Sequence, residues 1–330
     1  MLLKLFRQND SISFIFVFLW LSLLAILIVV FTSAEPTFSN FVTTGLKSWL
    51  QSRMNYSLTS NLNTFLFFAL ILVNSIYLNR LTLSYNIINS PGNLPMLFYI
   101  VFSIPALMFY SGFINILLSN TLLLMVFDLL LKTSEKKGVA IQYLSVGILL
   151  SISAYLYKPM LLFIPFIIIS QQILQHLTVR EFFYTLIGLA LPFLYLFSYH
   201  FLVDKNYDTT HTVINYYLEL KQVFVFKWQR SLIVYAVIFL HMIYSARAYE
   251  IYTKIKVIRR RYLSISVFLF FNSLAILLFV PGTGIEMLFF LAIPSSILFS
   301  IFFSNCKLTL ANKIMFSIIT YLFPLAWLLV

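Results

Sequence analysis

Long runs of apolar residues, separated by short polar segments, dominate the pattern of this chain. The first run, residues 12–31, contains no charged residue. An α-helix rises about 1.5 Å per residue, so about 20 such residues cross the roughly 30 Å hydrocarbon core of a membrane. The pattern recurs to the C-terminus and predicts about eleven membrane-spanning helices. These are residues 12–31, 62–78, 96–110, 113–131, 139–157, 159–175, 182–202, 231–246, 263–280, 287–303 and 314–330.

Two neighbouring runs, residues 96–110 and 113–131, leave an alternative open. Only Ser111 and Gly112 separate them, so they form either two short spans or one interrupted element. We expect two spans, of which the first is short. The choice decides on which side of the membrane the C-terminus lies.

Two polar segments carry a helical pattern of their own. In residues 42–54, apolar side chains recur on one side of a helix, and they are Val42, Leu46, Trp49, Leu50 and Met54. Residues 213–230 alternate in the same way. A helix with one apolar and one polar face lies in the plane of the membrane surface. We therefore predict two interfacial helices, both at the outer face.

The composition supports a single membrane domain over residues 1–330. Hydrophobic residues make up 61% of the chain and charged residues 10%, whereas soluble domains carry about 25% charged residues. A chain this apolar lacks the polar groups to cover a globular surface, so its solvent is largely lipid. The single cysteine, Cys306, excludes an internal disulfide and any site that needs several cysteines. The predicted fold class is all-α, a polytopic transmembrane helical bundle.

The basic residues orient this bundle. The net charge of +12 is high, and with the N-terminus in the cytoplasm most of the 22 Lys and Arg fall on the inner side, as the positive-inside rule requires. Arg259, Arg260 and Arg261 are then a topological anchor at an anionic leaflet and not a nucleic-acid patch. We predict a cytoplasmic N-terminus and no nucleic-acid partner.

The polar residues of the outer side are the candidates for chemistry. They are Glu35, Lys158, Asp204, Asp208, His211, Arg230 and Glu286. Acids, bases and cations at one lipid–water boundary suit a lipid-phosphate substrate, because a carboxylate deprotonates an acceptor and a cation neutralises a leaving phosphate. The simpler interpretation is that lipid excludes charges and drives them into loops. No metal site is predicted, and the sequence leaves the cofactor unknown.

Individual candidates differ in how they would act. Glu35 follows the first span directly and precedes Pro36, so it is either a catalytic base or the end marker of a span. Lys158 is the sole charge between two spans and is either a phosphate contact or a cation that reaches for the interface. Glu286 begins a span, where a carboxylate suits the helix N-terminus. We expect Asp128, near the inner end of a span, to be solvated.

Two stretches carry resemblances to known families. TVREFFYTLIGLALPFLYLFSYHFL, residues 178–202, resembles an uncharacterised family of bacterial multi-pass integral membrane proteins of about this length. GILLSISAYLYKPMLLFIPFIII, residues 147–169, is similar to the mid-chain hairpin of the polytopic GT-C glycosyltransferases, where a helix of small residues ends in a Lys before a Leu-rich span. The first resemblance implies a bacterial cytoplasmic (inner) membrane protein of unknown activity.

The GT-C resemblance implies transfer of a sugar or related group from a polyprenyl-phosphate-linked donor at the outer face. Glu35 and Pro36 occupy the place of the acidic residue in that family's first outer loop, and residues 42–54 match its interfacial helix in position. The chain departs from the family because the usual paired acids are reduced to one Glu, no C-terminal soluble domain follows, and the chain is shorter than most members. These departures concern activity more than fold.

Three functions remain open from the sequence. The first is the GT-C-like transfer, with Glu35 and Lys158 lining one outer cavity. The second is a non-catalytic membrane component of a cell-envelope assembly or secretion machinery, with envelope protein partners. The third is a lipid transporter, which should show inverted repeats and broken spans that this sequence does not display.

Overall fold

The computed structural model describes part of the chain, and every structural statement below concerns that part. It comprises residues 6–7, 13–17, 60–88, 92–107, 114–134, 139–174, 178–202, 257–280, 283, 285–306 and 309–322. These residues form helices and turns, without a strand among them. The longer elements are α4 (Ser60–Ser84), α5 (Leu94–Leu107), α6 (Ile114–Thr133), α7 (Ala140–Leu156), α8 (Ile164–Ile173), α9 (Val179–Leu202), α12 (Val257–Phe279), α13 (Leu288–Asn305) and α14 (Leu310–Ser317). Short 3₁₀ helices, η1 (Lys158–Phe163) and η2 (Ile285–Met287), precede α8 and α13, and the π-helical turn η3 (Ile318–Leu322) follows α14.

Several of these helices are long and apolar enough to cross a membrane, as the sequence predicted. Within the described residues there are five, in α4, α6, α9, α12 and α13, and α5, α7 and the η1–α8 segment are shorter apolar helices. The predicted span 231–246, most of 12–31 and the end of 314–330 fall on residues outside the description, as do both interfacial helices. The described residues thus contain fewer candidate spans than the eleven predicted.

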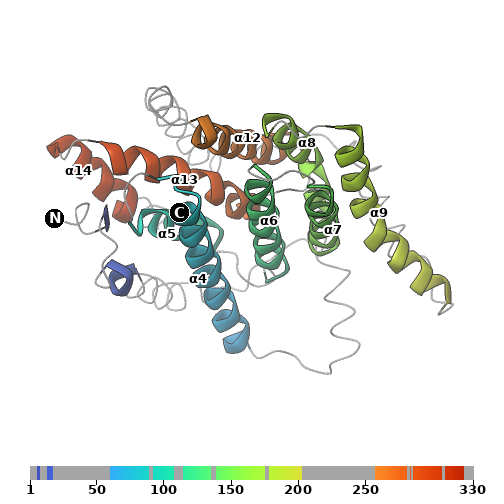
Figure 1. Cartoon of the computed structure of the whole chain (residues 1–330). Coiled ribbons are helices and arrows are strands. Elements are labelled where there is room, and N and C mark those ends of the chain that lie inside the picture. Colours follow the sequence, from blue (N-terminus) through green and yellow to red (C-terminus); the bar gives the residue numbers. More distant parts are fainter. Residues whose placement is uncertain are drawn as a thin grey trace.

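The helices pack in two rows. One row consists of α4, α6, α7 and α9, with α9 at its edge, and the other of α5, α13, α12 and α8 (Figure 1). Helices α5 and α13 form the centre of the core, because the described side chains of α5 and nearly all those of α13 are buried. A helix that is apolar on every side is expected to be surrounded by protein or lipid. Here the protein surrounds both.

Phenylalanines join these two central helices. The rings of Phe102 and Phe299 lie 4.9 Å apart, and Phe98 stacks on Phe303 at 5.4 Å. Phe316 of α14 contacts both Phe98 and Phe303. Aromatic pairs of this kind add about 0.5–1.5 kcal/mol each beyond the area that they bury.

The end of α13 is capped from the far end of the chain. The Arg7 guanidinium donates hydrogen bonds to the carbonyl oxygens of Phe303, at 2.6 and 2.9 Å, and of Cys306, at 2.5 Å. The last carbonyls of a helix have no partner within it, and a cation there also suits the helix dipole. Arg7 therefore ties its neighbour Phe6, which is buried in the core, to the end of α13.

Helix α4 continues further than the sequence predicted. The sequence predicted a span over residues 62–78, but the helix runs to Ser84. It ends when Asn86 adopts a φ of 49°, with Asn86 N–H donating to Leu83 and Ile87 N–H to Thr82. These two bonds define a Schellman motif, for which Asn is one of the few suitable residues. Asn86 is therefore the stop signal of α4.

The predicted hairpin at Lys158 is broken by an irregular turn. Tyr157 is extended, with φ −142° and ψ 104°, and η1 begins directly after it with Pro159 in its first turn. Proline has no amide hydrogen to lose at a helix start, which explains its place. The two predicted spans on either side appear as α7 and as η1 with α8.

Candidate functional site

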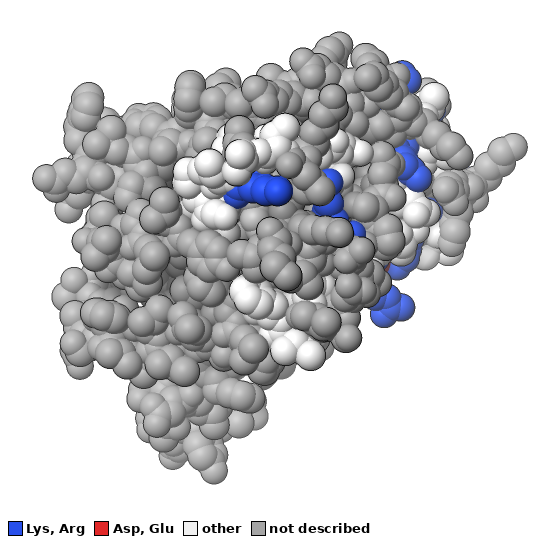
Figure 2. All heavy atoms as spheres, turned by 90° about the vertical axis from the view of Figure 1, so that its left-hand side faces the viewer, with Lys and Arg blue, Asp and Glu red and all other residues white. Residues whose placement is uncertain are grey.

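The described cations gather at one end of the bundle. The end of α6 meets the starts of α7 and α12, because Thr133 contacts Tyr143 and Ser134 contacts Tyr262. The ends of α4 and α13 and the start of α5 lie there too, as the contacts Tyr85–Tyr262, Asn79–Asn93 and Phe98–Phe303 show. We call it the basic end. Eight described basic residues belong to it, namely Arg7, Arg80, Lys132, Arg180, Arg259, Arg260, Arg261 and Lys313. Figure 2 shows Lys and Arg grouped on one face, without a visible described acid.

Lys158 and Glu286 lie at the opposite end. Ser119 near the start of α6 donates to the Ser153 carbonyl near the end of α7, so α7 reaches Lys158 away from the basic end. The rings of Phe67 and Phe289, near the starts of α4 and α13, meet at 6.0 Å. Among the described residues, Lys158 and Glu286 are the charges at this opposite end.

Aromatic packing brings the neighbourhoods of these two residues together. The ring of Tyr157 stacks on Phe290 at 5.5 Å, and Phe163 of η1 contacts the same ring at 5.9 Å. Tyr157 precedes Lys158, and Phe290 follows Glu286 by one helical turn. Lys158 is half-buried and Glu286 is 8% exposed, and each has a partner within the chain. The start of η1 therefore sits beside the start of α13.

The other predicted site residues lie outside the described part of the chain. They are Glu35, Asp204, Asp208, His211 and Arg230. The predicted cavity between Glu35 and Lys158 is accordingly not part of the description. The described acidic residue nearest to Lys158 along these contacts is Glu286, and the sequence did not predict that these two residues lie near each other.

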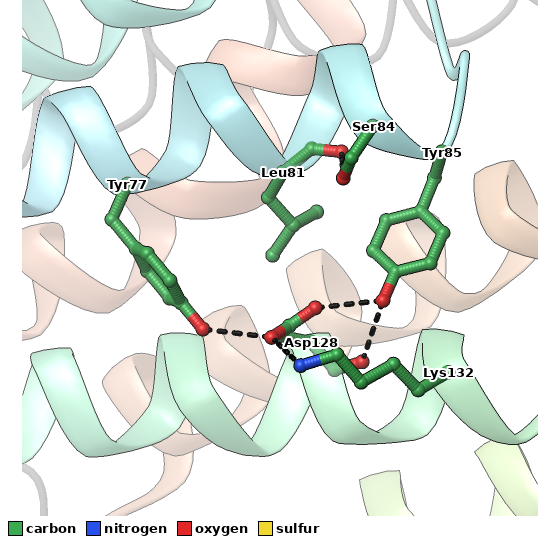
Figure 3. A network of polar contacts seen from close by, with 6 residues as sticks. All are labelled: Tyr77, Leu81, Ser84, Tyr85, Asp128 and Lys132. Carbon is green, nitrogen blue, oxygen red and sulfur yellow. Dashed lines mark hydrogen bonds and ion pairs between the residues drawn. The ribbon is translucent and has the colours of Figure 1, made fainter.

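A second polar site surrounds Asp128 at the basic end (Figure 3). Its Oδ2 accepts hydrogen bonds from the Tyr77 hydroxyl at 2.9 Å and from the Lys132 ammonium at 2.6 Å. Its Oδ1 accepts a third from the Tyr85 hydroxyl at 2.8 Å. The side chain of Asp128 is only 14% exposed, whereas that of Lys132 is 49% exposed. A carboxylate with three donors is held in its charged form and fixed in orientation.

The network extends to a third helix. The Tyr85 ring meets that of Tyr262 edge-on at 5.6 Å, and the Tyr262 hydroxyl lies 2.5 Å from Ser134 Oγ. Burial, reinforced by the hydrogen bond to Asp128, raises the pKa of Tyr85 far above its ordinary value. Helices α4, α6 and α12 are thus joined at one aromatic and ionic corner.

Asp128 corrects the prediction that this residue is solvated. The available signal was the pair Asp128 and Lys132, four residues apart, at the end of an apolar run. An ionisable residue within a span is a site hypothesis by default. What the pattern could not indicate is that α4 extends far enough to place Tyr77 and Tyr85 on either side of it.

Amides and hydroxyls join three helices deeper in the bundle. Thr121 donates to Asn74 Oδ1 at 2.8 Å, and Asn120 donates to the Tyr99 hydroxyl at 2.5 Å. Both asparagines are fully buried. Hydrogen bonds of this kind between spans contribute about 0.6–2 kcal/mol each. They hold α4, α5 and α6 in register.

Within the described residues, no three His, Cys, Asp or Glu side chains come together as a metal site. The site around Asp128 combines one carboxylate with two tyrosine hydroxyls and a lysine.

Comparison with known families covers most of the chain. The model of a family of unknown function, DUF6427, matches residues 49–327. The chain belongs to this family. No curated protein and no solved structure matches it. The predicted resemblance to an uncharacterised family agrees with membership in a family of unknown function. The several apolar helices of the structure mark this DUF6427 chain as a membrane protein. The GT-C architecture stays a prediction.

Proposed function

We propose that this DUF6427 protein spans the bacterial inner membrane about eleven times in a GT-C-like arrangement, with its N-terminus in the cytoplasm. It binds a polyprenyl-phosphate-linked donor at its outer face and transfers a sugar or related group from it. The supporting observation is the end of the bundle opposite the basic end, where Lys158 and Glu286 are the described charges. A half-buried lysine at such an edge is suited to a lipid phosphate.

The chemistry expected of this site follows from its charges. The Lys158 ammonium would pair with the phosphate of the donor and stabilise the charge that develops on it as the sugar leaves. Glu286 would hold the lysine when no donor is bound. Glu35 keeps its proposed role as the base that deprotonates the acceptor.

Binding of a short-chain polyprenyl phosphate to the purified protein in nanodiscs tests the proposal. Lys158→Met should weaken binding about tenfold or more, since a hydrogen bond to a charged group contributes about 1.5–3 kcal/mol. Arg180→Gln removes a cation from the basic end and is the matched control. Equal affinity of the wild type and Lys158→Met would contradict the proposal.

The alternative is a non-catalytic component of an envelope assembly. Helix α9 favours it, because this helix keeps a long apolar face exposed, which includes Phe183, Ile187, Leu194 and Phe197. A partner helix could cover that face as well as lipid does. Glu35→Gln separates the two functions. Retained binding with lost transfer supports the enzyme, whereas full function of the folded variant in the cell supports the assembly component.

A further inference from the structure

The corner between α6 and α12 at the basic end has a rigid frame. Tyr262, in the second turn of α12, is buried between the Ser134 hydroxyl and the ring of Tyr85. Arg259, Arg260 and Arg261 directly precede this anchored residue and are half-buried. The backbone that carries the three guanidiniums is therefore fixed against the ends of α4 and α6.

Among the residues that the structure describes, positive charge exceeds negative charge at this corner. Lys132 adds a fourth cation, and the acid that the structure places there is Asp128. Asp128 already accepts hydrogen bonds from Lys132, Tyr77 and Tyr85, so both of its oxygens are engaged. The other described acid of the basic end, Glu181, lies in the first turn of α9, which packs on α7. Each arginine has a contact within the chain, and among the described residues of this corner Asp128 supplies one negative charge beside four positive ones.

We propose that the α6–α12 corner binds the phosphate headgroup of an anionic phospholipid in the leaflet that the basic end faces. Guanidinium groups bind phosphate oxygens in pairs, with a planar geometry that lysine lacks. Clusters of basic residues at the end of a membrane helix attract anionic lipid by about 1 kcal/mol for each Lys or Arg. Four such residues on a fixed frame form a defined site at the other end of the bundle from Lys158.

The competing interpretation is a diffuse effect of charge. Basic residues on the inner side act as a topological signal wherever they lie within the loops. In that case any two cations of the basic end should matter equally for lipid binding. Arg180 and Lys313 are exposed at the same end but belong to α9 and α14, so they distinguish the two interpretations.

The test measures lipid retention by the full chain in nanodiscs of phosphatidylglycerol and phosphatidylcholine. Native mass spectrometry counts the phosphatidylglycerol molecules that stay bound to the protein after it is released from the nanodisc. The double variant Arg259→Gln/Arg260→Gln should lose preferential retention, with affinity lower by about fivefold for each arginine. The control double variant Arg180→Gln/Lys313→Gln should retain the wild-type number.

Two further results decide the proposal. Equal losses in both double variants, or wild-type retention in the arginine variant, would overturn it. Should the arginine variant fold poorly, Arg259→Lys/Arg260→Lys keeps the charge and loses the paired geometry. Retention intermediate between the wild type and zero in this variant supports guanidinium binding, and full retention contradicts it.

Discussion

Asp128 shows how much a single residue depends on its surroundings. The residue lies at the end of a membrane helix, where a solvated carboxylate would be unremarkable in sequence terms. Instead Tyr77, Tyr85 and Lys132 donate to it. Removing one of these donors leaves a largely buried carboxylate without one of its hydrogen-bond partners. The loss in folding free energy then exceeds the net strength of the lost hydrogen bond.

Tyr85→Phe tests this at the residue scale. The variant should lose about 2 kcal/mol of unfolding free energy at neutral pH, because Asp128 loses a donor. In the wild type, the raised pKa of Tyr85 keeps its hydroxyl protonated in the fold while the unfolded chain ionises above the ordinary pKa of 10.0. The stability is therefore fully present below pH 10 and falls as the pH rises above it.

Thermal unfolding in detergent between pH 8 and 11 measures both effects. Tyr85→Phe should lose stability less steeply above about pH 10 than the wild type, since it lacks the group responsible. Tyr195→Phe, which changes a tyrosine that is 74% exposed, is the matched control. Parallel curves for the wild type and Tyr85→Phe would show that the Asp128 network does not govern this range.

Helix packing at the next scale depends on small residues. Helices α7 and α9 cross where Gly147 faces Gly188. A β-carbon on Gly188 would meet the carbonyl oxygen of Leu144, and one on Gly147 that of Thr185, both well inside 3.0 Å. Gln171 of α8 also donates to the Thr185 hydroxyl, at 2.6 Å. Small residues allow such close approach between helices in lipid, where the hydrophobic effect does not drive their association.

Gly188→Ala should destabilise the protein by about 1–3 kcal/mol, because the added methyl group meets backbone that cannot move aside without separating the two helices. Ala190→Leu, at an exposed position of the same helix, adds more volume and should be nearly neutral. Steric trapping or chemical unfolding in detergent measures the difference. A neutral Gly188→Ala would mean that the α7–α9 crossing is looser than described.

The whole molecule is polarised along its length. Eight described cations lie at the basic end and one, Lys158, at the other. The helices reach this arrangement from positions scattered along the chain, from Arg7 to Lys313. The positive-inside rule then predicts that the basic end faces the cytoplasm.

Cysteine labelling tests that orientation. In a Cys306→Ser background, a membrane-impermeant thiol reagent added to intact cells should modify Ser52→Cys and spare Lys137→Cys. Permeabilised cells provide the control, since both positions should then react. Modification of position 137 alone in intact cells would reverse the orientation and remove the basis for an outer-face lipid-phosphate site.

The sequence by itself determined the class of this protein and most of its helices. Apolar runs of span length are visible without a structure, because lipid selects composition along the helix axis. The same reasoning predicted that most basic residues lie on one side of the membrane. The sequence also predicted two elements over residues 96–131, and the structure describes α5 and α6 as separate helices.

Tertiary structure alone decided which helices are central and which polar groups meet. Helices α13 and α9 are both apolar, yet α13 is surrounded by protein and α9 is largely exposed. Hydropathy measures how well a helix tolerates lipid and does not measure its fit to a neighbour, which depends on shape and small residues. For the same reason the sequence did not indicate that packing of Tyr157 on Phe290 sets Lys158 beside the start of α13, and the predicted pairing of Lys158 with Glu35 stays a prediction.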